Sequence, residues 1–491
     1  MSAPEDPEAL EPLSAVDHAW LRMDDPTNLM IINGCLVLDG PLERERLRDL
    51  LGRRLEPIRR FRQRILNHKG SPHWEVDPGF DIDAHVLEMD LPAPGGDEAL
   101  RKVVSDLMSV PFGLDRPLWR FYVLHGYKDG SVVMGRLHHC IGDGMALLLV
   151  LLSLTDRTAG ASPGVAPGPV DPDGPDGLED PDNPFTDLFR QPPRGAEAAK
   201  KLAEQIMPDG MRLMEQSAEA FNSMGAVATG LASSTAFARL VGRSADPKTI
   251  FKGPLGIPKR VAWSEPILVS DVREVGKALG GTINDVLLSA MTGGLRRYLD
   301  RHGQRSRGLN FRAAMPVNLR SIEKMSELGN RFGLIFLSLP VGIDDAVKRL
   351  GELRRRALAL KRSAEPVVVY AILRLLGMVP AAVQKMVVGI FASKTTLVMT
   401  NVPGPREELY LAGRALREIF FWVPQSGRVG LGVSIFSYAG HVRLGLASDT
   451  GLVPDPEVIV EGFHEEFEEL RARAASAGAA AAATEPPKIQ G

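Results

Sequence analysis

The segment from His138 to Gly144 reads HHCIGDG, in which two adjacent histidines are followed after three residues by an aspartate and a glycine. The apolar run 131–137 predicts a buried strand before it, and the apolar residues 145–154 predict a helix after it. Histidine has an unperturbed pKa of ~6.5, which suits proton transfer near neutral pH. Asp143 could orient an imidazole or brace the turn, and Gly144 could adopt a positive φ. The segment therefore predicts a catalytic base at a strand-to-helix junction.

The two histidines should not have the same role, because side chains alternate along a strand. One of His138 and His139 can enter a cleft while the other packs or makes a structural hydrogen bond, and the alternation does not say which. Two hydrogen-bonded core histidines are the alternative for so short a motif. The other histidines are scattered, so we expect no metal site. Cys140 is expected to be a small buried hydrophobe rather than a nucleophile.

Composition narrows the class of protein. The 491 residues allow two or three domains, and the net charge of -3 predicts no general attraction to nucleic acid. Only Cys35 and Cys140 are present, which predicts no disulfide framework and fits a reducing compartment. The acidic, proline-bearing residues 1–6 are unlike a secretory signal. We therefore expect a cytosolic protein.

The chain divides at a change in composition. Residues 158–193 hold nine prolines and many acidic residues, which predicts a linker that packs poorly, and a largely helical stretch follows over 197–241. The remaining residues predict two α/β halves, with a low-complexity tail that we expect to be disordered. The predicted units are 1–157, 158–250, 251–474 and the tail 475–491.

Periodicity predicts the elements of each half. The predicted strands are 30–38, 119–126, 131–138, 260–269, 309–315, 334–339, 397–401, 429–438 and 442–449. The predicted helices are 42–55, 98–108, 145–154, 283–301, 344–362 and 456–473.

The most apolar region is 366–392, which contains Arg374 and Lys385 and is too interrupted to span a bilayer. It predicts two short buried helices that meet at Pro380. The alternative is a surface that touches lipid or lines an acyl channel, since amphipathic segments with basic residues do lie at interfaces.

A second motif opens the helix 283–301. Thr282 as N-cap with Asp285 three residues later is a variant capping box, so we expect a structural role for Asp285. Asn284 lies in the first turn, where free N–H groups favour negative charge. Its amide could hold a developing oxyanion or orient a substrate carbonyl, or it could be an exposed polar residue.

These motifs together resemble the bacterial wax ester synthase/diacylglycerol acyltransferase family, which is related to condensation domains and to chloramphenicol-acetyltransferase-like enzymes. The HHxxxDG segment alone would be shared with condensation domains, whereas its combination with the other segments is more discriminating. The segments that carry the resemblance are LSAVD at 13–17, PLW at 117–119, HHCIGDG at 138–144, ND at 284–285, MPVNLR at 315–320, LGNRFG at 328–333 and TNVPGP at 400–405.

The resemblance implies an α/β fold of two chloramphenicol-acetyltransferase-like subdomains with a substrate channel between them. It implies acyl transfer from acyl-CoA to diacylglycerol or a long-chain alcohol, giving triacylglycerol or wax ester. His139 would be the general base, His138 a neighbour that shapes the site, and Asp143 a brace for the turn. Asn284 and Gly144 would orient the substrate or its oxyanion, and the motif residues Asp285, Pro117 and Trp119 would be structural.

The same resemblance implies no acyl-enzyme, no metal and no cofactor beyond acyl-CoA as substrate. The enzyme would be cytoplasmic and peripherally associated with a membrane or lipid-droplet surface. Segments around 224–241 and 367–390 could supply walls for the hydrocarbon chains. Two alternatives are a condensation-type enzyme that uses a carrier-protein thioester and a catalytically silent lipid-binding protein of the same fold.

Overall fold

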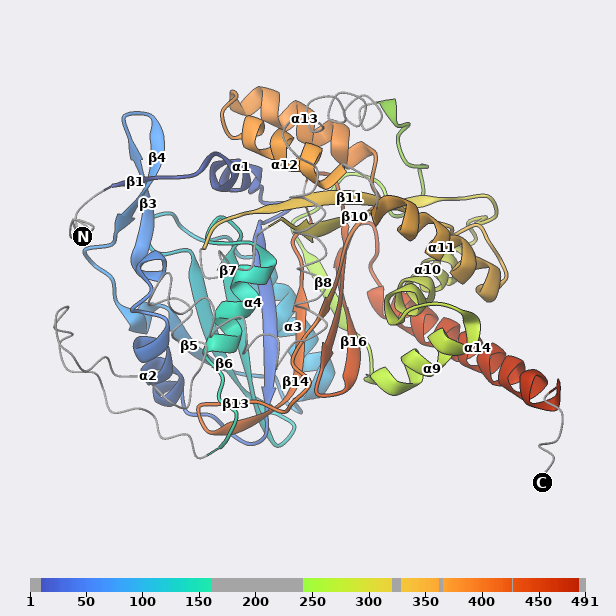
Figure 1. Ribbon diagram of the computed structural model, residues 1–491. Helices are drawn as coiled ribbons and strands as arrows, with labels where there is room; N and C mark the ends of the chain where they lie inside the picture. Colours follow the sequence, from blue (N-terminus) through green and yellow to red (C-terminus); the bar gives the residue numbers. More distant parts are fainter. Residues whose placement is uncertain (1–9, 160–241, 320–327, 362–364, 426, 485–491) are drawn as a thin grey trace, which may run out of the picture.

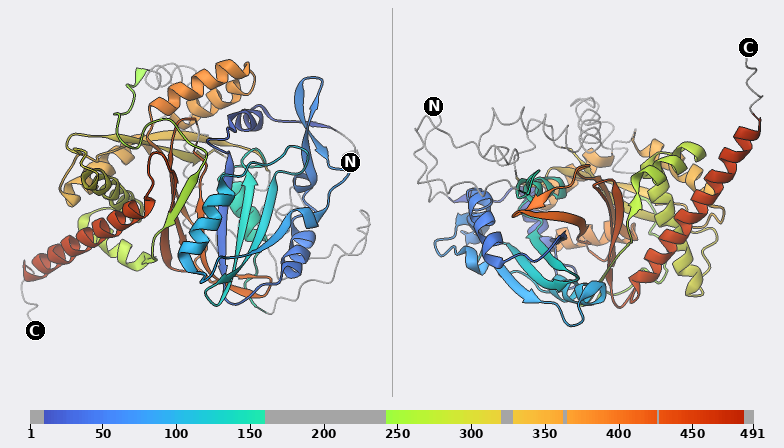
Figure 2. Two further views of the ribbon diagram at one scale, coloured as in Figure 1. Left: turned by 180° about the vertical axis from the view of Figure 1, so that it is seen from behind. Right: turned by 90° about the horizontal axis from the view of Figure 1, so that it is seen from below.

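The structure is a computed structural model that describes residues 10–159, 242–319, 328–361, 365–425 and 427–484 (Figure 1). The predicted linker from residue 160 onward and the predicted helical stretch 197–241 lie outside the described residues. Two large sheets lie side by side, and helices cover the outer face of each (Figures 1 and 2). The α/β fold class predicted from the sequence is confirmed.

The first large sheet contains the strand that leads to the HHxxxDG turn. Its strand order is β13-β14-β2-β7-β6-β5, and a small separate sheet has the order β1-β4-β3. Helix α4 follows β7 directly, which confirms the predicted strand-to-helix junction. The bounds are β1 (Glu11–Pro12), α1 (Ala15–Met23), β2 (Ile31–Leu38), α2 (Arg44–Arg54), β3 (Gln63–His68), β4 (Ser71–Val76), β5 (Val86–Asp90), α3 (Gly96–Met108), β6 (Trp119–Tyr127), β7 (Gly130–His138), α4 (Gly144–Ser153), β13 (Tyr410–Leu411) and β14 (Arg414–Trp422).

The second large sheet is built from the C-terminal half of the chain. Its order is β11-β10-β12-β15-β16-β8, and β9 also pairs with β16. Helices α9, α10, α11 and α14 gather on its outer side (Figure 1). The bounds are β8 (Lys259–Trp263), β9 (Ile267–Leu268), α9 (Val269–Leu279), α10 (Ile283–Arg301), β10 (Phe311–Asn318), β11 (Phe332–Leu339), α11 (Ala346–Lys361), α12 (Glu365–Leu376), α13 (Ala381–Ser393), β12 (Leu397–Pro403), β15 (Leu431–Tyr438), β16 (His441–Asp449) and α14 (Pro456–Thr484).

The two sheets are joined by an exchange of strands and by a shared apolar cluster. Strand β14 comes from the C-terminal half but pairs antiparallel with β2 of the first sheet, from Leu416 opposite Leu38 to Trp422 opposite Asn33. Strand β13 extends the same edge. The buried cluster between the sheets combines both halves; it includes Cys35, Tyr122, Met134, Val261, Trp263, Phe420 and Trp422. The sequence patterns did not predict this crossover.

Two predicted segments differ from the structure. The predicted strand 260–269 is two strands, β8 and β9, and Val269 already begins α9, because Pro266 lacks the N–H that would continue the ladder. The tail predicted to be disordered from residue 475 instead continues α14 to Thr484. Its alanines explain this, since alanine has the highest helix propensity.

The apolar region 366–392 forms α12 and α13, with Pro380 as the N-cap of α13, as the two-helix prediction stated. Leu373 and Leu376 of α12 belong to the core of the first half, but α13 buries only Gln384 and Ala392, so the prediction that both helices are buried is wrong for α13. The described part of the chain holds no helix long and apolar enough to cross a bilayer.

Candidate active site

The turn between β7 and α4 is clamped by a loop from the other half of the chain. Gly142 forms an isolated parallel bridge with Gly329. The Gly329 N–H donates to the carbonyl of Ile141 at 3.1 Å, and the Asp143 N–H donates to the carbonyl of Gly329 at 3.2 Å. The HHxxxDG turn is therefore held by the LGNRFG segment, which is far from it in sequence.

Asp143 holds this turn with both of its carboxylate oxygens. One oxygen caps α4 by accepting from the N–H of Ala146 at 3.0 Å, and the other accepts from the N–H of Arg331 at 3.1 Å. No hydrogen bond between Asp143 and either histidine ring is found among the described residues. These contacts support the predicted bracing role, which stays a prediction for catalysis.

His139, in the turn between β7 and α4, is buried, with 7% of its surface exposed. Its Nδ1 is 2.8 Å from Oδ1 of Asn330. The imidazole stacks on the indole of Trp20, with ring centroids 4.1 Å apart, and Phe332 lies at 5.6 Å. Burial lowers the pKa of His139 to about 4, although the charge of Asp143 acts in the opposite direction. The ring is therefore neutral at physiological pH.

Asn330 links this histidine to the N-terminal helix. Its Nδ2 donates to Oδ1 of Asp17 at 2.8 Å and to the backbone carbonyl of His139 at 2.7 Å. Its backbone N–H also donates to Asp17, at 3.2 Å. The second oxygen of Asp17 accepts from the hydroxyl of Ser14, the N-cap of α1. Residues from three distant segments thus surround one imidazole.

His138 is buried on different partners. Its Nδ1 accepts from the N–H of Cys140 at 3.1 Å and lies 3.0 Å from the Cys140 sulfur. Its Nε2 is 3.7 Å from Asp24 and has no hydrogen-bond partner in the described part of the chain. Because the two rings have separate surroundings, the predicted divergence of the histidines is present. Cys140 is buried, and burial raises the pKa of its thiol.

The other predicted site residues are placed as follows. Asn284 is exposed at the start of α10, where its Oδ1 accepts from Nδ2 of Asn401 at 3.0 Å, and it makes no described hydrogen bond to the HHxxxDG turn. Asp285 and Thr282 form the predicted capping box. Gly144 does not take the expected positive φ. Asp143 leads the chain straight into α4, so Gly144 is helical, and the space beside its Cα is open.

The PLW segment supports the strand that carries the histidines. The carbonyl of Leu118 accepts from the N–H of His138 at 2.9 Å. Pro117 is buried, and the buried indole of Trp119 donates to the carbonyl of Phe61 at 2.8 Å. Both residues are buried beside this strand, and the structural role that the family resemblance implies for them stays a prediction.

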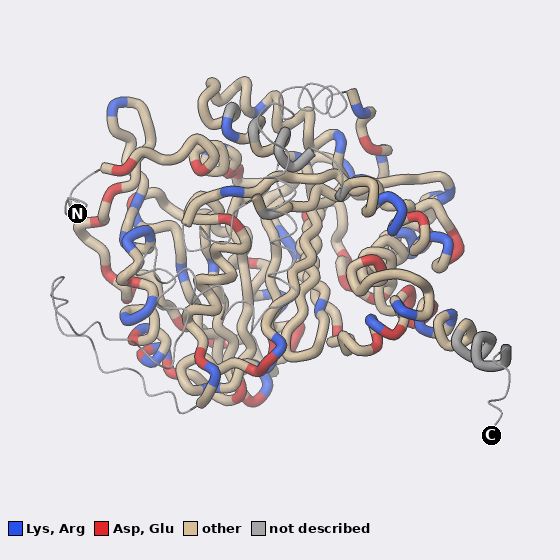
Figure 3. The backbone as a smooth tube through the Cα atoms, in the orientation of Figure 1, with Lys and Arg blue, Asp and Glu red and all other residues tan. Residues whose placement is uncertain are grey.

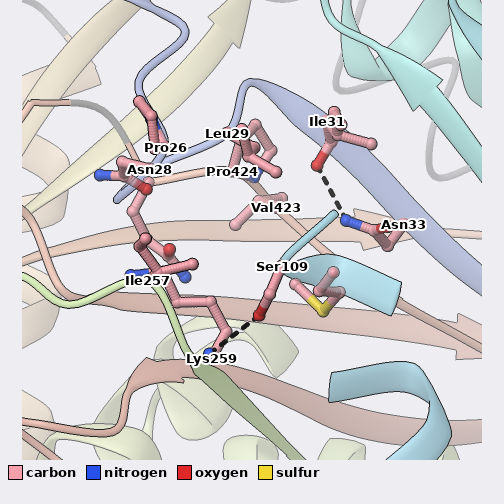
Figure 4. A pocket seen from close by; sticks show the side chains of 12 residues that line it. Pro26, Asn28, Leu29, Ile31, Asn33, Ser109, Ile257, Lys259, Val423 and Pro424 are labelled. Carbon is pink, nitrogen blue, oxygen red and sulfur yellow. Dashed lines mark hydrogen bonds between the residues drawn. The ribbon is translucent and has the colours of Figure 1, made fainter. Parts of the chain in front are cut away.

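A small pocket lies where the two halves meet (Figure 4). Ile31 and Asn33 of β2 form one wall, Lys259 of β8 another, and residues 423–425 after β14 a third. Ile31 is also the register partner of His138. The pocket therefore opens beside the strand pair that leads to the histidines. Among the described residues, no group of three or more His, Cys, Asp or Glu side chains could hold a metal ion.

Sequence reasoning named neither Asn330 nor Trp20 as a site residue, and it left Asp17 without a role. Asp17 and Asn330 lay in segments that carried the family resemblance, so that signal existed. Trp20 follows Asp17 by three residues on α1, which no periodicity had predicted as a helix. The contacts of Asp17, Trp20 and Asn330 around His139 form only in the tertiary fold, so local sequence patterns do not predict them.

Comparison with known proteins identifies the family to which the two halves of the chain are similar. A family model for the wax ester synthase/diacylglycerol acyltransferase catalytic domain matches residues 13–287, and one for the corresponding C-terminal domain matches residues 328–471. A probable diacylglycerol O-acyltransferase, tgs1, of Mycobacterium tuberculosis is 26% identical over 92% of this chain and 94% of its own.

Two solved structures share the fold. The wax ester synthase/diacylglycerol acyltransferase from Marinobacter aquaeolei has a TM-score of 0.66 at 21% identity, covering 95% of this chain and 100% of that one. The first condensation domain of the calcium-dependent antibiotic synthetase has a TM-score of 0.56 at 15% identity, covering 96% and 97%. The described architecture is thus the two-subdomain fold expected from the sequence.

Proposed function

We propose a specific reaction for this chain, which belongs to the wax ester synthase/diacylglycerol acyltransferase family of acyltransferases. It moves a fatty acyl group from acyl-CoA to the hydroxyl of diacylglycerol or of a long-chain alcohol. The observation that carries the proposal is a buried, neutral imidazole, His139, whose Nδ1 is engaged by Asn330. Such a ring leaves Nε2 to accept a proton.

The reaction needs one proton relay and no covalent enzyme intermediate. Nε2 of His139 takes the proton of the alcohol as its oxygen attacks the thioester carbonyl carbon, forming a tetrahedral oxyanion. The oxyanion collapses, the carbon–sulfur bond breaks, and the leaving CoA thiolate takes the proton from the imidazolium. The products are an ester and free CoA, and His139 returns to its neutral form.

The oxyanion needs donors that are already in place. The backbone N–H of Gly144 lies in the first turn of α4, and the space beside its Cα is open. The amide of Asn284 is the second proposed donor. Its hydrogen bond with Asn401 directs Oδ1 toward that residue and leaves its own Nδ2 to donate.

The test is a direct assay of the purified chain. Palmitoyl-CoA is supplied with hexadecanol or with diolein, and both released CoA and lipid product are measured. Wax ester or triacylglycerol that forms with wild type but not with His139→Ala supports the proposal. Turnover with a carrier-protein thioester but not with acyl-CoA would favour the condensation-type alternative, and lipid binding without turnover would favour the silent one.

We further propose that α13 touches the lipid surface that holds the acceptor. Val383, Met386 and Ile390 of α13 are exposed, as is Met378 in the turn before it, with Met378 at 76% and Met386 at 61%. Residues 366–393 hold no aspartate or glutamate, and the region is mostly uncharged in Figure 3. The exposed Lys385 adds a charge suited to anionic headgroups. The partner surface is therefore an anionic bilayer or droplet.

Flotation on phosphatidylcholine–phosphatidylglycerol vesicles tests this surface. The triple change Met378→Ser, Met386→Ser and Ile390→Ser should reduce flotation while turnover of detergent-dispersed substrate stays near wild type. Leu114→Ser with Leu358→Ser is the matched control, because those residues are similarly exposed elsewhere and do not line the pocket of Figure 4. Unchanged flotation, or equal loss in the control, would contradict the proposal.

A further inference from the structure

The side-chain amide of Asn330 has only one orientation that its neighbours accept. The two atoms around its Nδ2 are a carboxylate oxygen of Asp17 and the backbone carbonyl oxygen of His139, and both are acceptors only. A flipped amide would set its oxygen against both of them. Nitrogen must therefore occupy that position, and Oδ1 must be the atom that faces the imidazole.

The orientation of this amide fixes the proton on the ring. Oδ1 of Asn330 can only accept, so Nδ1 of His139 must carry the hydrogen at this 2.8 Å contact. A neutral imidazole has one N–H, which leaves the lone pair on Nε2. The opposite tautomer would put two acceptors face to face in a buried site, which costs the desolvation of both.

We infer that Asn330, anchored by Asp17, is a positioning residue that selects the Nδ1–H tautomer of His139 and so keeps Nε2 basic. The catalytic consequence rests on the proposed role of His139, whereas the tautomer itself does not. The assembly joins three segments: α1 supplies Asp17, the β7–α4 turn supplies His139, and the loop before β11 supplies Asn330. The base is completed only where the two halves of the chain meet.

The amide of Asn330 orients the His139 ring without placing a negative charge directly against it, as a carboxylate would. The group that touches the ring is neutral, and the negative charge of Asp17 lies one residue behind it. The titratable groups that face His139 are Asp143 and His138 in the turn and, through Asn330, Asp17. A direct carboxylate would favour the imidazolium and raise the pKa of the ring. The amide orients the ring and leaves it neutral.

The first test reads the tautomer without substrate. Nitrogen NMR of the protein with labelled histidine, with His139 assigned by difference from His139→Gln, should show the proton on Nδ1 in wild type. In Asn330→Ala the ring should become a mixture of tautomers. Gln384→Ala is the matched control, because it removes another buried amide that donates to α1, at Ala19, without touching His139. An Nε2–H tautomer in wild type, or an unchanged ring in Asn330→Ala, would overturn the inference.

The second test reads the rate. Asn330→Ala should lower kcat by about 10–100-fold, a part of what a positioned base contributes, with KM little changed. Asn330→Asp should raise the pH at which the acid limb of kcat falls, because a carboxylate now faces Nδ1. A wild type that lacks acyl transfer yet shows the Nδ1–H ring would reject the proposed function and keep the tautomer assignment. Full activity in Asn330→Ala would reject the positioning role alone.

Discussion

The two sides of the β7–α4 turn carry neighbouring histidines with different surroundings. On the His138 side the hydrogen-bond partner is Cys140, two residues away, and the outer ring nitrogen, 3.7 Å from Asp24, has no hydrogen-bond partner among the described residues. On the His139 side the partners are Asn330, Trp20 and Phe332, all far away in the chain. The hydrogen bond of one ring is local in sequence, and that of the other depends on the tertiary fold. The comparison teaches that long-range contacts, rather than the motif itself, set the two rings apart.

Removing the ring on the long-range side should have the largest effect. His139→Ala should lower turnover by ~10²–10⁴-fold, the usual contribution of a positioned general base. Circular dichroism and the melting temperature should show a folded protein. Comparable turnover in His139→Ala and wild type would show that the ring is not the base.

Asp143→Asn removes one of the two backbone hydrogen bonds by which Asp143 holds the turn between β7 and α4. The variant keeps a cap for α4 but turns an NH₂ group toward the N–H of Arg331, so it should lose about 1–3 kcal/mol of unfolding free energy together with activity. Denaturant unfolding and the acyl-transfer assay measure the two effects. A fully stable but inactive variant would instead indicate that Asp143 acts directly on the imidazole.

Removing the ring on the local side should matter less. His138→Ala should lower turnover by less than about tenfold, because this ring does not take the proton in the proposed reaction. The same assay with both histidine variants decides the assignment. An inactive His138 variant beside an active His139 variant would reverse it.

The pH profile should show the smallest change of all. Since the pKa of His139 is lowered to about 4, kcat/KM should stay level from pH 8 to about pH 5.5 instead of halving near 6.5. The folded pKa lies below the unfolded value, so the unfolded chain takes up the proton first as pH falls. The free energy of unfolding therefore loses nothing to His139 above about pH 6.5, and it decreases as the pH falls from there toward pH 4. A kcat/KM that halves between pH 6 and 7 would contradict the neutral buried base.

The sequence predicted the local structure around the site better than its assembly. Strand β7, helix α4 and the Thr282–Asp285 capping box follow from periodicity and capping, which act over a few residues. The Asn330–His139 contact spans 191 positions and has no such signal. The sequence left a positive φ open for Gly144, because it does not reveal that Asp143 caps the next helix and makes Gly144 helical. The donors Asn284 and Gly144 remain predictions.

The strand exchanged between the halves has a consequence for how substrates reach His139. If the two halves rotated apart, β14 would have to separate from β2. The hydrogen bonds between Leu38–Leu416 and Asn33–Trp422 would break, and Phe420 and Trp422 would become exposed to water. The halves are interlocked rather than hinged. The substrates of the proposed reaction would therefore have to reach His139 without any separation of the two halves, and turnover should not require β14 to leave β2.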